Sequence, residues 1–118
     1  NTLSTSNGAT FGAPSGISTS GTLAAAQTLS PNVACTAQNL AVSITAAPGG
    51  TKTRVFAINV DGSDTAVTCT VTSAATTCDS AAATALIPAG SLIAISSGAT
   101  GSGSAAAADL RFGWECIP

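Results

Sequence analysis

Four cysteines are the side chains of this 118-residue sequence best suited to bind a metal, react with an oxidant or bond to each other. The spacings between them along the chain are 34, 9 and 38 residues. Structural zinc sites use closely spaced Cys or His ligands, and redox sites use Cys-x-x-Cys. The sequence has neither spacing, and it has no histidine. We therefore predict no metal site and expect two disulfides.

The segment TAVTCTVTSAATTCDS predicts which cysteines pair. A tight turn at residues 73–74 places Cys69 opposite Cys78 on adjacent antiparallel strands, with Cβ atoms about 4.5–5.5 Å apart. A disulfide spans that separation with slight adjustment. Cys35 then pairs with Cys116 by elimination. Because disulfides persist in oxidising surroundings, we expect a secreted protein that is extracellular or sits on a cell or virion surface.

The five carboxylates offer few routes to catalysis. Catalysis needs a positioned acid, a base or a metal, and the sequence has no His and no Tyr. Asp61 and Asp64 share a hairpin loop that lacks the further carboxylates of a calcium site, so we interpret them as turn residues. Asp109 and Glu115 remain as a glycosidase pair, but exposed aromatic platforms for a sugar are missing. We predict no enzymatic activity, no catalytic residue and no cofactor.

Charged residues are scarce in this chain, at 7% of the sequence, against about 25% in ordinary soluble domains. No charged side chain occurs in residues 1–50. The sequence has no basic patch for nucleic acid and too few basic residues for an anionic membrane surface. It also has no apolar run of about 18 residues, so we expect no membrane insertion. Low charge favours self-association, and we expect copies of the same chain as partners.

Apolar residues alternate with polar ones from Asn32 onward, which is typical of β-strands. In NLAVSIT, for example, Leu40, Val42 and Ile44 share one face. A four-residue loop at 61–64 would pair Phe56 with Cys69. The pattern predicts an all-β domain over 32–118, a two-sheet antiparallel sandwich or jelly roll. Residues 97–109 are predicted to form a long low-complexity loop.

Residues 1–31 form a Ser/Thr/Ala-rich arm that we predict to be extended. Four of its isolated apolar residues are candidates for assembly contacts, either with the same domain or with a neighbouring copy: Leu3, Phe11, Ile17 and Leu23. A disordered tail is the other interpretation that the composition allows.

The stretch NLAVSITAAPGGTKTRVFAINVDGSDTAVTCTVTSAATTCDS, with the later IPAGSLIAISS, resembles a β-module of bacterial and phage surface proteins, where it often follows collagen-like or fibre segments. The matching pieces occur in order over residues 40–97: AAPG, the hairpin NVDG, the TCT strand, a Cys-bearing return strand and a Gly turn. The resemblance implies a jelly roll of the tumour-necrosis-factor/C1q kind, often trimeric. Ser91 replaces the usual acidic residue, and the uncharged arm replaces a collagen repeat.

Together these features favour a non-enzymatic structural subunit of an extracellular filament, appendage or virion surface. The subunit would assemble into a homo-oligomer or filament through its β-domain and its arm, with the arm received by a neighbour as an added strand. The alternative is a glycan-binding or adhesive head with loop 97–109 at the binding end. That alternative rests on analogy with other jelly rolls that bind sugars.

Overall fold

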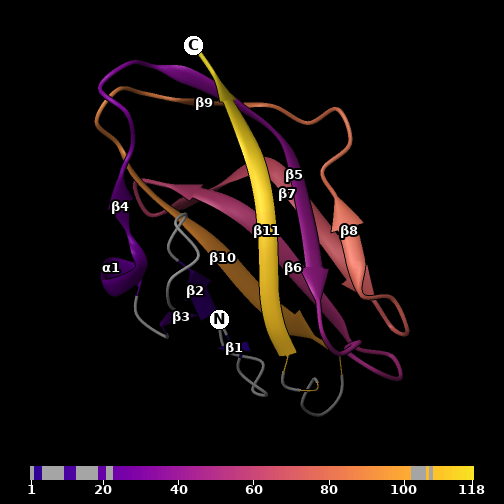
Figure 1. The fold of residues 1–118 in the computed structure, drawn as a ribbon. Coiled ribbons are helices and arrows are strands. Elements are labelled where there is room, and N and C mark those ends of the chain that lie inside the picture. Colours follow the sequence, from indigo (N-terminus) through magenta and orange to yellow (C-terminus); the bar gives the residue numbers. More distant parts are fainter. Residues whose placement is uncertain (1, 4–9, 13–18, 21–22, 102–105, 107) are drawn as a thin grey trace.

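The predicted alternation of inward and outward side chains is realised in a computed structural model that describes residues 2–3, 10–12, 19–20, 23–101, 106 and 108–118 (Figure 1). Within these residues the chain forms short strands near the N-terminus, longer strands from Cys35 onward, and one single-turn helix. The elements are β1 (Thr2–Leu3), β2 (Thr10–Gly12), β3 (Thr19–Ser20), α1 (Leu23–Ala26), β4 (Thr28–Leu29), β5 (Cys35–Ile44), β6 (Thr53–Val60), β7 (Ser63–Thr72), β8 (Thr77–Asp79), β9 (Ala85–Ile87), β10 (Leu92–Thr100) and β11 (Ala108–Ile117).

Two antiparallel sheets pack face to face, which confirms the predicted all-β sandwich. The front sheet in Figure 1 has the order β1-β11-β5-β8, with β9 also paired to β5. The back sheet has the order β3-β2-β10-β6-β7, with β4 also paired to β10. All pairings are antiparallel. The chain changes sheet several times after β5, since β6 and β7 lie behind, β8 and β9 in front, and β10 behind again.

The core fills the space between the sheets with the residues that the alternation assigns to inner faces. In β5, Leu40, Val42 and Ile44 are buried, whereas Ala41 and Ser43 between them are exposed. Burial of these apolar surfaces is the main force that holds the sheets together. The buried cluster comprises Cys35, Ala37, Leu40, Val42, Ile44, Phe56, Ile58, Val67, Cys69, Val71, Ile87, Ile93, Ile95, Ala108 and Leu110. In β11 the inward Phe112 and Trp114 only partly enter this cluster.

The hairpin between β6 and β7 differs from the predicted four-residue loop. Val60 pairs with Ser63, so the turn consists of Asp61 and Gly62 alone. Both residues have positive φ, 50° and 92°, which a two-residue hairpin turn of type I′ requires and which Asp-Gly sequences favour. An irregularity between Ala57 and Asn59 then restores the predicted pairing of Phe56 with Cys69.

The predicted long loop over 97–109 is also wrong in extent. Strand β10 continues to Thr100, and β11 begins at Ala108. Residues 97–100 and 108–109 of the predicted loop therefore belong to strands. Ser97 faces the core opposite Phe56 and is buried. Serine and glycine obscure the period-two pattern here because their small side chains carry little hydrophobic signal.

Candidate functional site

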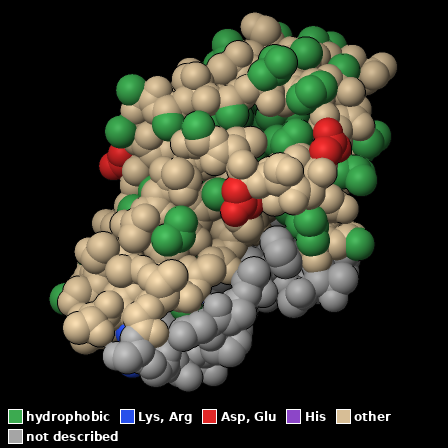
Figure 2. Space-filling model, turned by 180° about the vertical axis from the view of Figure 1, so that it is seen from behind, with side chains coloured by type: hydrophobic (Ala, Val, Ile, Leu, Met, Phe, Trp, Pro, Cys, Tyr) green, Lys and Arg blue, Asp and Glu red, His purple; other side chains and the backbone are tan. Residues whose placement is uncertain are grey.

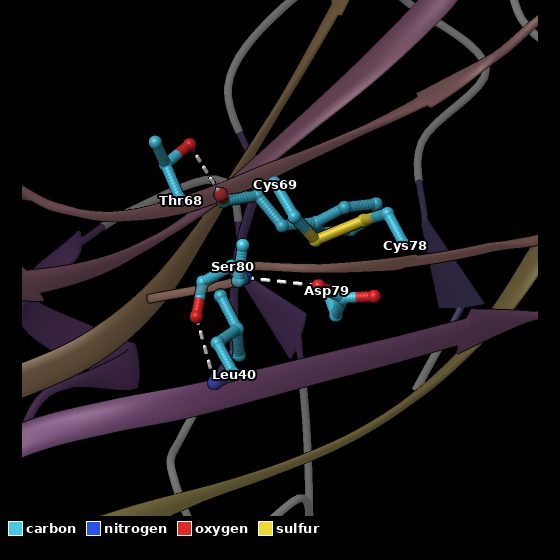
Figure 3. The surroundings of a disulfide bond; sticks show 8 residues. Leu40, Thr68, Cys69, Cys78, Asp79 and Ser80 are labelled. Carbon is cyan, nitrogen blue, oxygen red and sulfur yellow. Dashed lines mark hydrogen bonds between the residues drawn. A yellow bond between two sulfur atoms is a disulfide. The ribbon is translucent and has the colours of Figure 1, made fainter. Parts of the chain in front are cut away.

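The Cys69–Cys78 disulfide links the two sheets rather than two strands of one sheet (Figure 3). Cys69 lies in β7 at the edge of the back sheet, and Cys78 lies in β8 at the edge of the front sheet. Their Cα atoms are 5.7 Å apart. The predicted pairing of these cysteines is correct, but the predicted same-sheet hairpin is wrong. The bond closes one side of the sandwich covalently.

The turn after β7 explains why the chain leaves the back sheet. Ser73 has a φ of 48°, and the N–H of Ala75 donates to the carbonyl of Thr72 at 2.8 Å. The carbonyl of Thr76 then accepts from the N–H of Ile44 at 2.8 Å, which joins the chain to β5 of the front sheet. Ser-Ala lacks the residue types that a tight type I′ turn needs, so a direct hairpin is disfavoured.

Ser80, the residue after β8, is hydrogen-bonded to Leu40 of β5 (Figure 3). The pairing of β5 is irregular next to this position. Asn39 has a φ of 56°, and the register between β5 and β11 shifts beside it. The N–H of Leu40 donates to Ser80 Oγ at 3.0 Å, and the N–H of Ser80 donates to the carbonyl of Leu40 at 2.9 Å. These bonds satisfy backbone groups that the irregular ladder leaves open.

The Cys35–Cys116 disulfide joins neighbouring strands of the front sheet, β5 and β11, with Cα atoms 5.4 Å apart. This pairing confirms the prediction made by elimination. It closes a loop of 81 residues in sequence separation, so it ties the first long strand to the last. All four cysteines are therefore in disulfides, which indicates a protein that folds in an oxidising compartment.

The described parts of the arm add strands to both sheets on the side opposite the Cys69–Cys78 bridge. Leu3 of β1 pairs with Ala108 of β11 at the edge of the front sheet. Phe11 of β2 pairs with Ser96 of β10 in the back sheet, and β3 pairs with β2 outside it. Main-chain pairing of strands, rather than covalent bonding, thus closes this side of the molecule.

The remaining candidates of the arm have different positions. Leu23 begins α1 and is half-buried, and Ile17 lies outside the described residues. The end of the arm is well anchored: the N–H of Ser30 donates to the carbonyl of Ser91 at 2.7 Å, and Ser30 Oγ donates to the carbonyl of Pro88 at 3.2 Å. Ser30 is buried.

A polar cluster on the outer face of the back sheet was not predicted from the sequence. Asn59 Nδ2 donates to Asp64 Oδ1 at 2.8 Å, and Ser96 Oγ donates to the same oxygen at 2.8 Å. Asn59 is only 3% exposed although it lies on the outer face, whereas Asp64 is exposed. The cluster borders a pocket of about 350 Å³ that is also lined by Leu23 of α1. The signal in the sequence is Asn59, a polar residue between the apolar Ile58 and Val60 of β6.

Two of the carboxylates considered for calcium or catalysis, Asp61 and Glu115, accept hydrogen bonds within the fold. Asp61 Oδ1 accepts from the N–H of Leu92 at 2.8 Å, which links the hairpin turn to β10. Glu115 Oε2 accepts from Gln38 Nε2 at 3.1 Å and Asn39 Nδ2 at 2.7 Å. These bonds, with Gln38 the stronger influence, lower the pKa of Glu115. Among the described residues, no three Asp, Glu, His or Cys side chains gather into a metal-binding group.

Arg54 is buried among the inner-face residues of β6 although it carries a charged side chain. Its Nη2 donates to the carbonyl of Ala106 at 2.8 Å, which links β6 to this residue shortly before β11. Burial lowers the pKa of the Arg54 guanidinium. Arg54 lies two residues before Phe56 in β6, so both side chains point to the same inner face. This position in the strand accounts for the burial of Arg54 despite its charge.

The surface carries few charged side chains. On the face drawn in Figure 2, isolated acidic side chains lie among scattered hydrophobic side chains. Among the side chains that the structure describes, the large hydrophobic ones that remain exposed are Leu29, Val33, Val55, Leu86, Leu92 and Ile117. Among the described residues, no helix has the length and apolar character to cross a bilayer.

The chain matches no protein-family model, and comparison with curated proteins and with solved structures gives no match.

Proposed function

We propose that the chain is a non-enzymatic structural subunit of an extracellular filament, appendage or virion surface, and that copies are joined by exchange of their N-terminal arms. In this proposal β1 and β2 of one copy occupy the positions on a neighbour that they occupy in the single chain. The proposal deepens the sequence-based hypothesis by naming the acceptor strands, β11 and β10.

The observation that carries the proposal is the difference between the two sides of the sandwich. The side formed by β7 and β8 is closed by the Cys69–Cys78 bond. The opposite side is closed by arm strands whose described parts are short, two residues in β1 and three in β2. Such strands are held by few main-chain hydrogen bonds, and the same bonds form when a second copy supplies the strand. Exchange therefore needs no new interface chemistry.

Surface charge supports association in the same way. The chain carries a net charge of −2, and its arm carries no charged side chain. Charged side chains on edge strands are a common protection against pairing with other chains. The described strands of the arm lack this protection, which fits a segment that is received by another copy.

The jelly-roll topology belongs to this proposal. It is supported by the alternation of successive strands between two sheets and by the pairing of β1, near the N-terminus, with the last strand, β11. Jelly rolls occur in viral capsid proteins and lectins, which is an analogy at the level of the fold.

Cross-linking of the paired positions Thr2 and Asp109 tests the arm exchange. In the variant Thr2→Cys/Asp109→Cys, exchanged arms bring the two new thiols of different copies together. We expect mild oxidation to produce a ladder of covalent multimers on a non-reducing gel, and reduction to collapse the ladder to the monomer.

The single variants Thr2→Cys and Asp109→Cys are the matched controls, since neither can form covalent chains longer than a dimer. A double variant that oxidises entirely to a monomer with an internal 2–109 bond would show that each copy keeps its own arm, and the proposal would be wrong.

A further inference from the structure

Asn59, one of the residues that line the pocket beside the polar cluster of Asn59, Asp64 and Ser96, has an acceptor that the fold leaves unsatisfied. Asn59 Oδ1 is buried and has no hydrogen-bond partner among the residues that the structure describes. The orientation of its amide is fixed, because the NH₂ group must face the carboxylate of Asp64, which only accepts hydrogen bonds when ionised. Buried polar groups without partners are rare and call for an explanation. A bound ligand that donates a hydrogen bond to Asn59 Oδ1 is one such explanation.

Asp64 supplies a second acceptor at the same place. Both hydrogen bonds that it receives, from Asn59 and from Ser96, end on Oδ1, so its carboxylate is held in position while Oδ2 keeps its acceptor capacity. The residue is exposed, so a ligand can reach it. A carboxylate held by two neighbours offers an oriented acceptor at no further ordering cost on binding.

The rest of the lining is apolar or open. Leu23 and Val55 contribute aliphatic surface. Gly62 and Gly98 contribute bare backbone, and a Cβ added at either position meets no atom within 4 Å. A ligand for this pocket therefore needs donors on one side and an apolar face on the other.

This combination fits a neutral sugar ring better than a metal ion. A ring presents hydroxyl donors at its edge and C–H groups on its face, and about 350 Å³ is within the size of small-ligand pockets. Calcium sites use six to eight oxygen ligands with several carboxylates, and Asp64 is the one carboxylate that lines this pocket. From these observations we propose that the pocket between α1, β6, β7 and β10 binds one neutral monosaccharide unit through Asp64 and Asn59.

The polar groups that carry the inference, Asn59, Asp64 and Ser96, lie in the β-domain, and Leu23 of the arm supplies only apolar surface to the pocket. The inference therefore does not depend on which copy supplies the arm. Without an aromatic platform among the described residues of the lining, a single ring gives weak affinity, with a dissociation constant on the order of 1 mM.

Nuclear magnetic resonance titration of the full chain with methyl glycosides of glucose, galactose, mannose and N-acetylglucosamine tests this site. We expect at least one glycoside to shift the Asn59 side-chain amide and the backbone amides of Gly62 and Gly98 in a saturable way. Asp64→Asn retains an acceptor for Asn59 and Ser96 but replaces Oδ2 with a donor, so we expect binding to weaken about tenfold or more.

Gly98→Leu provides a test by filling the pocket, and Gly113→Leu is its matched control. Gly113 borders an open depression on the outer face of the front sheet, and a Cβ there also meets no atom within 4 Å. We expect Gly98→Leu to abolish the shifts and Gly113→Leu to preserve them, with both variants giving the spectrum of a folded protein.

Three results would overturn the site. These are no glycoside-dependent shift at about 50 mM ligand, well above the expected dissociation constant, equal binding by Gly98→Leu and the native chain, or saturable shifts caused by Ca²⁺ alone. Each of these leaves the arm exchange untouched, because the cross-linking test does not depend on the pocket.

Discussion

The fold stabilises the ionised form of Glu115, an exposed carboxylate of β11. Two amide side chains of β5, Gln38 and Asn39, donate to it and stabilise its charged form, so its pKa in the folded chain lies below the ordinary 4.5. A carboxyl group with a lowered folded-state pKa contributes stability above its unfolded pKa, and the contribution is lost as pH falls through the folded value. The contribution of Glu115 is therefore fully present at neutral pH, and the pH dependence that it adds to stability is confined to acidic pH.

We predict that Gln38→Ala and Asn39→Gly each raise the titration midpoint of Glu115, followed through its carboxyl carbon by nuclear magnetic resonance. Gln38→Ala should have the larger effect, since its bond is the leading cause of the shift. Glycine suits position 39 because it tolerates the positive φ of 56° there. Ser43→Ala, on the exposed face of the same strand, is the control. Unchanged midpoints in both amide variants would contradict the assignment.

At the scale of elements, the two disulfides differ in the length of chain that they close. The sequence separations are 81 residues for Cys35–Cys116 and 9 for Cys69–Cys78. Each bond joins one buried cysteine to one half-buried cysteine, so the burial of the sulfurs is similar. Loop length is then the main difference between them.

We predict that Cys35→Ala/Cys116→Ala destabilises the chain more than Cys69→Ala/Cys78→Ala. On the chain-entropy model the losses are about 4.5 and about 2.7 kcal/mol. Urea unfolding of the two double variants and of the native chain measures both. If the short-loop variant were the less stable of the two, the connection between the sheets would matter more than loop closure, and the entropic account would be wrong.

Much of the fold was predictable at this scale because it depends on period-two alternation. Leu40, Val42 and Ile44 are buried as their spacing indicates, and both cysteine pairs are correct. Turn chemistry limited the prediction. The Asp61–Gly62 turn is two residues long, and the residues after Thr72 cross to the other sheet. Whether a strand returns to its own sheet depends on tertiary packing that a local pattern does not contain.

The pocket was not predictable in the same way. Its residues come from β6, β7, β10 and α1, and the positions of these elements relative to one another follow from the sheet order. Asn59 reads in the sequence as part of a hairpin signal, and its burial follows from the sandwich rather than from its neighbours in the chain. Asp64 meets Asn59 and Ser96 only because β6 pairs with both β7 and β10, and the pairing with β10 joins segments that are distant in the sequence.

The whole molecule is covalently closed on one side and held by arm strands on the other. The Cys69–Cys78 bond joins the sheets at β7 and β8, while β1 and β2 pair at the opposite edges. Opening of the sandwich is therefore expected first on the arm side, because the described arm strands hold that side by short main-chain pairings and the other side is bonded covalently. In the proposed assembly, this asymmetry would let copies join on the arm side while the covalently closed side stays folded.

Sedimentation analysis combined with electron microscopy of the purified full chain, with its disulfides intact, tests the proposed assembly most directly. We predict oligomers or filaments whose size grows with concentration and shrinks when a synthetic peptide of residues 1–22 is added in excess, because the peptide competes for the acceptor strands. A peptide of the same composition in scrambled order should have no effect. A monomer at every accessible concentration, with or without the peptide, would contradict the proposed assembly.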